Sequence, residues 1–397
     1  MKNETSVYID LDNIGNNAKV ITEKYKDYKY FIGVLKSNSY GHGEYIVNEL
    51  VKNGINYIAV SYIDEAIKIR NFNKKIPILL LEPVSLSDID KVIENKLTIT
   101  VHDIDYLEEI LKLDIKNKIK VHMKIDSGMN RLGFKDRKEV RKAYDLINES
   151  EKLELEGIYT HFATIGLFDK HYDDQVKRFK IITALIDLKD IPIVHLGSSV
   201  ILLSHPKLSF ATGVRMGIVL YGYNVSPTYS NKGLKNKLRN IRNKHYQKKY
   251  NISPLIYNTK LDLKPAMSMT TSILQIKKVR KGETIGYGAS YKAKEDMKVA
   301  ILPVGYNNGI GRKNIDRFVI INSKKCPVVG EMSMNMMIVK VDKNVELNDK
   351  VYILGGGITL GMLSRMDGSS ISGTLLNIGK NNKKTYLKND KIEYVEE

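Results

Sequence analysis

Residues 30–43, YFIGVLKSNSYGHG, join a short apolar run to a turn rich in glycine and hydroxyl groups. The run is typical of a buried strand that ends at Lys36. Desolvation at such a position favours the neutral form of an amine, which is the form that makes a Schiff base with a carbonyl. The turn beyond it offers backbone N–H groups and the hydroxyl of Tyr40, which suit a phosphate. Amine and phosphate-binding turn together indicate pyridoxal phosphate (PLP) as a cofactor.

This apolar run is the first of eight in the N-terminal part of the chain. Continuous runs rich in Ile and Val predict strands buried on both faces. Helical patterns lie between them, and eight strand–helix units close naturally into a (β/α)8 barrel. A doubly wound open sheet is the alternative, but it does not explain why polar residues recur at so many strand ends. The eight runs cover residues 31–35, 57–61, 76–81, 97–101, 120–125, 155–161, 191–196 and 214–221.

From about residue 262 the pattern changes to short β-rich segments separated by Gly, Asn and Lys-Asp turns. This texture predicts a mostly antiparallel β domain. The expected class is therefore α/β plus β, with a TIM-like (β/α)8 barrel followed by that domain. We expect the barrel over residues 8–230, a basic inserted linker over 231–260 and the β domain over 261–397, with residues 1–7 packing on it.

Composition narrows the function classes. The net charge of +18 suggests nucleic-acid binding as one candidate function. Residues 223–261 are basic and contain no acid, yet no DNA- or RNA-binding motif accompanies them. An exposed inserted loop or helix is the favoured interpretation, and nucleic acid is an unlikely partner. The single cysteine, Cys326, fits a reducing compartment. No secretion signal or long apolar span is visible, so a cytoplasmic protein without membrane contact is expected.

Polar residues gather where the predicted strands end. In a barrel of this kind, active-site residues come from the C-terminal ends of the strands and the loops that follow. The strand ends supply an amine, arginines, histidines, hydroxyls and backbone amides. They are Lys36 and Tyr40, then Lys124, Asp126, Met129 and Arg131, then Tyr159 and His161, then His195, Ser198 and Ser199, and finally Arg215, Gly217 and Ile218.

Several short motifs resemble those of bacterial alanine racemases and occur in that family's order. The resemblance covers nearly the whole chain and implies a PLP-binding barrel followed by a β domain, in agreement with the pattern above. It also implies interconversion of L- and D-alanine, which supplies D-alanine for cell-wall peptidoglycan. The motifs are KSNSYGHG at 36–43, KIDSGMNRLG at 124–133, THFAT at 160–164, VRMGIVLYG at 214–222, LKPAM at 263–267, GYG at 286–288, VGY at 304–306 and the Ser333-Met334 region.

The resemblance also implies roles at the cofactor. Lys36 would hold PLP and act as one base, and His161 would lie beside the cofactor. Arg215 would face the pyridine nitrogen; because an arginine does not hand over a full proton as a carboxylic acid does, the ring would stay largely neutral and favour racemisation. The phosphate would be held by Tyr40, Ser199 and the amides of Gly217 and Ile218.

Racemisation needs a base on each face of the substrate carbon. By resemblance the second base is Tyr287, supplied by the partner subunit and assisted by His161, so the enzyme would be a homodimer with shared sites. Around the amino-acid substrate, Arg131 would bind the carboxylate or bias the phenol, Met334 would line the pocket and Tyr306 its entrance. Lys124 matches a lysine that is carbamylated in some members. We expect no metal.

Some family positions are altered. They lie around the expected substrate, so serine or another amino acid is an alternative substrate. A PLP-binding protein with little catalysis and a nucleic-acid accessory using 223–261 are alternatives from other classes. The altered positions are Asn335 for an aspartate, Glu331 for an arginine, Ser198 for an asparagine and Ser372 in the place of a phosphate-binding tyrosine.

Overall fold

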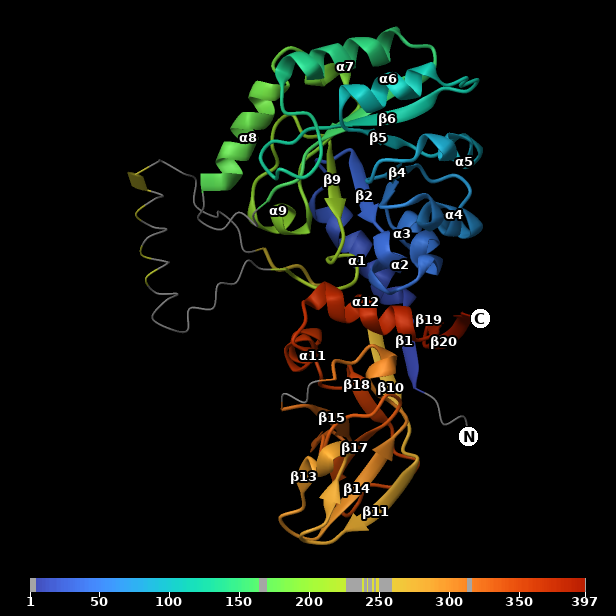
Figure 1. The fold of residues 1–397 in the computed structure, drawn as a ribbon, viewed down its shortest axis with the longest axis vertical. Helices are drawn as coiled ribbons and strands as arrows, with labels where there is room; N and C mark the ends of the chain where they lie inside the picture. Colours follow the sequence, from blue (N-terminus) through green and yellow to red (C-terminus); the bar gives the residue numbers. More distant parts are fainter. Residues whose placement is uncertain are drawn as a thin grey trace. The chain divides into compact units, whose positions relative to one another are not determined.

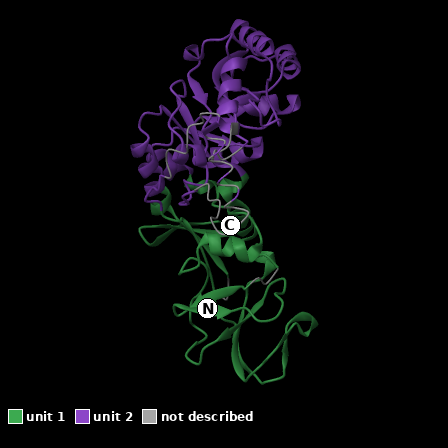
Figure 2. Cartoon of the chain, turned by 90° about the vertical axis from the view of Figure 1, so that its left-hand side faces the viewer, with its two compact units in different colours: residues 1–14, 37–46, 264–397 green, residues 15–36, 47–263 purple. Residues whose placement is uncertain are grey.

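The computed structural model divides into two compact units (Figure 2). Unit 1 comprises residues 1–14, 37–46 and 264–397, and unit 2 comprises 15–36 and 47–263. The expected linker over 231–260 lies, apart from a few residues, outside the described part of the chain, so the role of its basic cluster stays a prediction. The structure describes residues 5–163, 170–225, 259–312 and 316–396, together with Leu238, Ile241, His245, Lys248 and Lys249.

Unit 2 contains eight parallel strands in the order β4-β3-β2-β9-β8-β7-β6-β5. The two ends of this order, β4 and β5, are joined next to Thr98. The N–H of Leu80 donates to the carbonyl of Thr98, and the N–H of Thr98 donates to the carbonyl of Ile78, each at 2.8 Å. Every strand overlaps one of the eight predicted apolar runs, so the (β/α)8 prediction is confirmed. The strands are β2 (Tyr30–Val34), β3 (Tyr57–Val60), β4 (Ile78–Leu80), β5 (Ile99–Val101), β6 (Ile119–Lys124), β7 (Leu153–Tyr159), β8 (Ile193–His195) and β9 (Gly213–Met216).

Amphipathic helices follow the strands and lie outside them (Figure 1). In α7 (Arg137–Glu149), Asp136 caps the first turn by accepting from two backbone N–H groups, and Val140, Ala143 and Ile147 form the buried face. Helix α1 (Leu11–Lys24) begins in unit 1 and continues into unit 2. The other helices of unit 2 are α3 (Val47–Lys52), α4 (Ile63–Phe72), α5 (Ile89–Glu94), α6 (Ile104–Lys112), α8 (Lys170–Ile182) and α9 (Ser199–Ser204).

Unit 1 is built on a seven-stranded sheet in the order β16-β15-β18-β10-β1-β19-β20. Only the β1–β19 pair is parallel, and β11-β14-β17 and β12-β13 form two smaller antiparallel sheets. The predicted, mostly antiparallel β domain is therefore confirmed. Its strands are β1 (Ser6–Asp10), β10 (Met267–Thr271), β11 (Gln275–Val279), β12 (Thr284–Ile285), β13 (Tyr291–Lys292), β14 (Met297–Leu302), β15 (Phe318–Ile321), β16 (Lys324–Pro327), β17 (Met337–Val341), β18 (Val351–Leu354), β19 (Lys384–Lys388) and β20 (Lys391–Val395).

The turn that follows β2 is left-handed. In α2 (Lys36–Tyr40), residues 37–40 have φ between 50° and 55°, although none of them is glycine. Such a conformation costs roughly 1–2 kcal/mol per residue, so its surroundings must impose it.

Within unit 1, two close contacts fix this turn. The hydroxyl of Tyr386 donates to the carbonyl of His42 at 3.0 Å. In α12 (Ile371–Asn381), which follows α11 (Leu360–Asp367), a Cβ added at Gly379 would lie 1.9 Å from the carbonyl oxygen of Gly41. The helix backbone therefore approaches the turn as closely as glycine alone permits.

Candidate active site

Four ionisable side chains stand at the C-terminal ends of barrel strands in unit 2. Lys36 follows β2, Lys124 ends β6, His161 follows β7 and Arg215 lies in β9. Because these strands are parallel and belong to one continuous barrel, all four residues belong to the same mouth. Lys36 and His161 are partly buried, and Lys124 and Arg215 are buried.

Arg215 is 4% exposed and is held by neutral acceptors. Its Nη1 donates to the carbonyl of His195 at 2.7 Å and to His195 Nδ1 at 2.8 Å. Its Nη2 donates to the carbonyls of Thr160 at 2.7 Å and Leu196 at 3.2 Å, and to His161 Nδ1 at 3.3 Å. Among the described residues, no carboxylate pairs with Arg215 and no protein acceptor engages its Nε–H. Burial lowers the pKa of Arg215 to about 10, so the guanidinium stays charged at neutral pH.

His161 is a neutral imidazole. Burial, followed by the positive charges of Arg215 and Lys124, lowers its pKa to about 3. An arginine can only donate, so Nδ1 of His161 is the acceptor and Nε2 carries the hydrogen. The ring therefore presents an N–H donor on its other side.

Lys124 carries an amine that titrates near neutrality. Burial, and then the charges of Arg215 and Arg131, lowers its pKa to about 7. Its Nζ lies 4.3 Å from the ring centroid of Tyr159, whose hydroxyl shares a 2.8 Å hydrogen bond with Thr100 Oγ1. A substantial fraction of the amine is neutral at pH 7 and above.

The loop after β6 presents Arg131 at the surface. Asp126 Oδ1 accepts from the N–H groups of Gly128 at 3.0 Å and Asn130 at 2.9 Å. A Cβ at Gly133, where φ is 121°, would lie 2.6 Å from the carbonyl oxygen of Lys124. The carboxylate and the close backbone approach thus set the shape of the loop that carries Arg131.

Three of the residues predicted to bind a phosphate meet in unit 2. Ser199 is the first residue of α9, and its Oγ accepts from the N–H of Gly217 at 2.9 Å. Ile218 follows directly along the chain and is buried. The fourth residue, Tyr40, ends the left-handed turn and belongs to unit 1.

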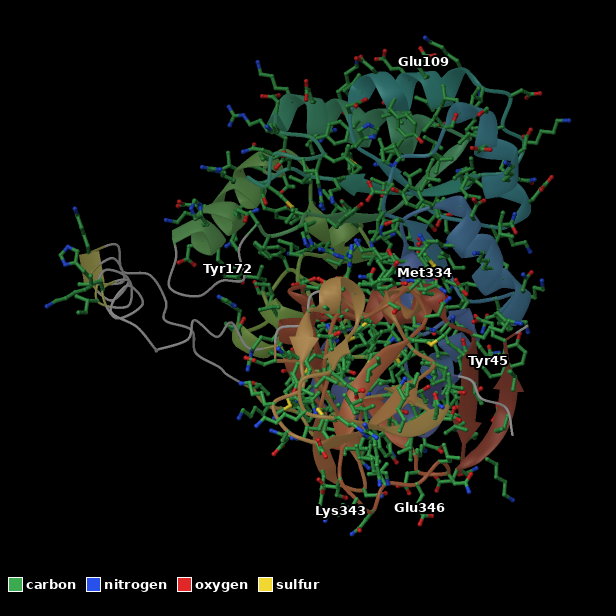
Figure 3. All side chains as sticks on the ribbon, turned by 60° about the horizontal axis from the view of Figure 1, so that its bottom comes forward. Tyr45, Glu109, Tyr172, Met334, Lys343 and Glu346 are labelled. Atoms are coloured by element: carbon green, nitrogen blue, oxygen red, sulfur yellow. The ribbon has the colours of Figure 1, made fainter. Side chains whose placement is uncertain are left out.

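The remaining predicted residues form one surface of unit 1. Tyr287, Tyr306 and Met334 are 68%, 38% and 54% exposed (Met334 is labelled in Figure 3). The N–H of Tyr306 donates to the carbonyl of Ser333 at 3.3 Å, which joins the turn η5 (Tyr306–Asn308) to the loop before Met334.

The turn that carries Tyr287, η4 (Tyr287–Ala289), packs on the same loop. The N–H of Glu331 donates to Ser290 Oγ at 3.0 Å. A Cβ at Gly286 would lie 2.9 Å from the backbone nitrogen of Glu331. The three exposed side chains therefore stand on contiguous segments.

The altered positions are exposed or partly exposed. The carboxylate of Glu331 lies 3.5 Å from Arg312 Nη2. Asn335 is exposed, as is Ser372 near the start of α12, and Ser198 precedes α9 without capping it through its side chain. None of these four residues is a hydrogen-bond partner of Arg215; within the described part of the chain, those partners are His195, Thr160, His161 and Leu196.

The comparisons with known proteins agree with this geometry. The model of the alanine racemase N-terminal domain matches residues 9–225, and that of the C-terminal domain matches residues 266–386. The chain belongs to the alanine racemase family. It is therefore an amino-acid racemase, and the resemblance of its motifs to that family is confirmed.

Individual members of the alanine racemase family match over most of the chain. The alanine racemase of Borreliella burgdorferi is 34% identical and that of Methanococcus maripaludis 33%, covering 98% and 87% of this chain and 98% and 88% of those proteins. The structure of Bacillus anthracis alanine racemase with bound L-Ala-P has a TM-score of 0.84 at 29% identity, covering 100% of this chain and 98% of that one. A histidine racemase from Leuconostoc mesenteroides, 21% identical with a TM-score of 0.81, shows the shared fold alone.

Two residues behind the site of this racemase were missed in the sequence, and a third was noted without a role. His122 and Glu156 were missed, and His195 was placed only at a strand end. One signal was available: in the strand IKVHMK, polar residues alternate at 120, 122 and 124. Side chains at alternate positions share one face of a strand. In a closed barrel, one of the two faces of each strand lines the interior, so a polar set of this kind indicates polar residues there.

Proposed function

We propose that this protein is a PLP-dependent alanine racemase that interconverts L- and D-alanine in the cytoplasm and supplies D-alanine for cell-wall peptidoglycan. The observation that carries the proposal is the state of Arg215. It is a buried, charged arginine at the barrel mouth, and its hydrogen-bond partners are neutral acceptors. No acceptor among the described residues engages its Nε–H, which is therefore available to a ligand. The names of the relatives support alanine as the substrate.

The residues at the mouth fit PLP chemically. Lys36 offers an amine for the cofactor's carbonyl, and Arg215 offers an N–H to an acceptor nitrogen. Ser199 offers a hydroxyl hydrogen and Ile218 a backbone N–H for a phosphate, to which Tyr40 would add a hydroxyl. The N–H of Gly217 donates to Ser199 Oγ at 2.9 Å and would have to exchange that bond to reach a phosphate. When bound, PLP supplies an electron sink that eases removal of the Cα proton of an amino acid.

Arg215 limits what that sink does. It remains protonated at neutral pH and donates a hydrogen bond without giving up its proton. A ring nitrogen that accepted from Arg215 would therefore stay largely unprotonated, and the substrate carbon would regain its proton quickly. Arg215 would thus favour racemisation over other reactions at that carbon.

Two bases would serve the two faces of the substrate carbon. Lys36 would move the proton on one face, and Tyr287 from a second copy of the chain would move it on the other, in a homodimer. A phenol ordinarily ionises near pH 10, so it needs a donor when it gives up its proton. His161 can supply one through Nε2–H, because Arg215 engages its Nδ1.

The substrate's other groups would meet residues that are exposed in the single chain. Arg131 would bind the carboxylate. Met334 would line the pocket from the partner subunit, and Tyr306 would stand at its entrance. The exposed surface that Tyr287, Tyr306 and Met334 form on unit 1 is what a shared site requires of an isolated chain.

Racemisation assays of the purified, PLP-loaded protein test the proposal. We expect D-alanine from L-alanine and the reverse, with an equilibrium constant near one. A higher kcat/KM for serine or another amino acid would instead support the alternative that Glu331, Asn335 and Ser372 have changed the substrate. PLP binding without turnover of any amino acid would contradict a racemase and favour a weakly active PLP-binding protein.

We also propose that Lys124 is carbamylated, since its pKa of about 7 leaves the neutral amine that reacts with CO2. With ¹³C-bicarbonate at pH 8, a bound ¹³C carbamate signal should appear, and it should weaken as the pH falls below about 7 and the amine is protonated. A Lys124→Ala variant is the control that should lack the signal. A wild-type spectrum without it would refute the modification.

A further inference from the structure

Behind Arg215, buried polar side chains continue into the barrel interior. Nε2 of His195 lies 2.9 Å from Nδ1 of His122, and Nε2 of His122 lies 3.4 Å from Oε2 of Glu156. Both imidazoles are fully buried. Glu156 stands on β7, yet it contacts Tyr57 on β3, which is not its neighbour in the sheet. The contact therefore crosses the interior of the barrel.

The direction of the hydrogen bonds in this chain is determined. Burial lowers the pKa of both histidines, so both are neutral. Arg215 can only donate, so Nδ1 of His195 accepts and its Nε2 carries the hydrogen. That hydrogen is donated to Nδ1 of His122, which places the hydrogen of His122 on Nε2. Each ring is thus held in its Nε2–H form, and the last hydrogen faces Glu156.

Glu156 is suited to end such a chain because every group around it donates. Tyr57 donates to Oε2 at 2.6 Å, Thr98 donates to Oε2 at 3.3 Å and Lys120 donates to Oε1 at 2.6 Å. Burial by itself would raise the pKa of Glu156, but its contacts with His122, Lys120 and Tyr57, in that order of size, outweigh burial and lower the pKa to about 2. The residue is a carboxylate. Its contact with His122 is long for a hydrogen bond and is mainly electrostatic.

The backbone makes room for this arrangement. A Cβ added at Gly157 would lie 2.6–2.7 Å from three atoms of the His122 ring. The register between β6 and β7 also shifts between Val121 and His122. A side chain at position 157 would displace the imidazole that links His195 to Glu156.

We propose that Glu156 is a positioning residue for the racemase, acting on Arg215 through His122 and His195. Its negative charge faces Nε2 of His122, which makes the Nε2–H form of both histidines the stable one and so keeps the Nδ1 lone pair of His195 on Arg215. The opposite polarity would set an N–H of His195 against an N–H of Arg215. The inference rests on the proposed function, because Arg215 is placed there at the cofactor's ring nitrogen.

Neutron diffraction of the deuterated wild-type protein tests the chain without any substitution. We expect deuterium on Nε2 and none on Nδ1 in both His122 and His195. Deuterium on Nδ1 of His195 would overturn the inference. This result does not depend on turnover, so it stands apart from the racemase proposal, which fails if the wild-type protein binds no PLP or racemises no amino acid.

Glu156→Gln tests the consequence for Arg215. An amide can donate as well as accept, so the variant removes the charge and admits the reversed polarity. We expect kcat to fall about 10- to 100-fold, the cost typical of losing an outer orienting group, with KM little changed. The visible absorption spectrum of bound PLP should shift as well, which a loss of stability alone would not produce.

Glu154→Gln is the matched control. Glu154 is an exposed carboxylate on the same strand and also lies near Lys120, at 3.9 Å, but within the described residues no hydrogen-bond chain links it to Arg215. Its variant should retain the wild-type kcat and spectrum. If Glu156→Gln showed the same kcat and spectrum as Glu154→Gln, Glu156 would have no positioning role.

Discussion

Replacing Lys36 with alanine is expected to abolish the absorbance of bound PLP and the racemase activity together. The side chain would both attach the cofactor and move the proton on one face of the substrate carbon. Its loss should therefore lower kcat by on the order of 10⁴-fold or more. Absorbance spectra after PLP loading and a coupled alanine racemisation assay measure the two effects on the same sample.

Lys29→Ala is the control for this variant. Lys29 is exposed and precedes β2, so it stands at the other end of the same strand. Its loss removes one positive charge without touching the barrel mouth, and activity should be unchanged. A Lys36→Ala protein that kept the PLP absorbance would show that another residue holds the cofactor.

The barrel could be predicted from the sequence because its strands are buried on both faces. All four residues of β3, for example, are buried, so the strand appears in the sequence as a continuous apolar run. A run this short, bounded by turns, is typical of a strand in a parallel sheet. Strand ends were informative for a related reason. Lys36 and Arg215 are polar residues directly after or within apolar runs, and parallel strands bring such residues to one mouth.

The left-handed turn at 37–40 could not be predicted in this way. Ser and Tyr ordinarily avoid that conformation. Asparagine adopts it more readily, but only as a single residue, so local sequence gives no reason for four consecutive residues to choose it. Its cause lies far along the chain, where Gly379 and Tyr386 of unit 1 close on it. Long-range packing of this kind overrides local preference.

The role of Glu156 was hidden for a different reason. An acidic residue in a predicted strand is easily taken for a solvent-facing one. Its partners Tyr57 and His122 come from other strands, and which atoms meet depends on the register and on the irregularity between β6 and β7. The polar alternation in β6 reveals that something polar fills the barrel but not which carboxylate ends the chain.

The second large effect is expected for Tyr287→Phe, and its cause can be separated from a loss of folding. Removing the phenolic hydroxyl takes away the base on one face, so kcat should fall about 10²- to 10⁴-fold while the PLP absorbance persists. Lys36→Ala and Tyr287→Phe chains would then be inactive for different reasons. In a shared site, each chain still carries the base that the other lacks.

Mixing the two inactive proteins therefore decides whether the site is shared. If subunits exchange at random in equal amounts, half of the dimers contain one chain of each kind, and one of their two sites pairs an intact Lys36 with an intact Tyr287. Activity should rise to about a quarter of the wild-type value per chain. If both bases came from one chain, every site in the mixture would lack one of them and no activity would return. Mixing two batches of Tyr287→Phe protein shows what exchange alone does. A shared site explains the exposure of Tyr287 in the single chain only if activity returns in the mixture of the two variants and not in the Tyr287→Phe control.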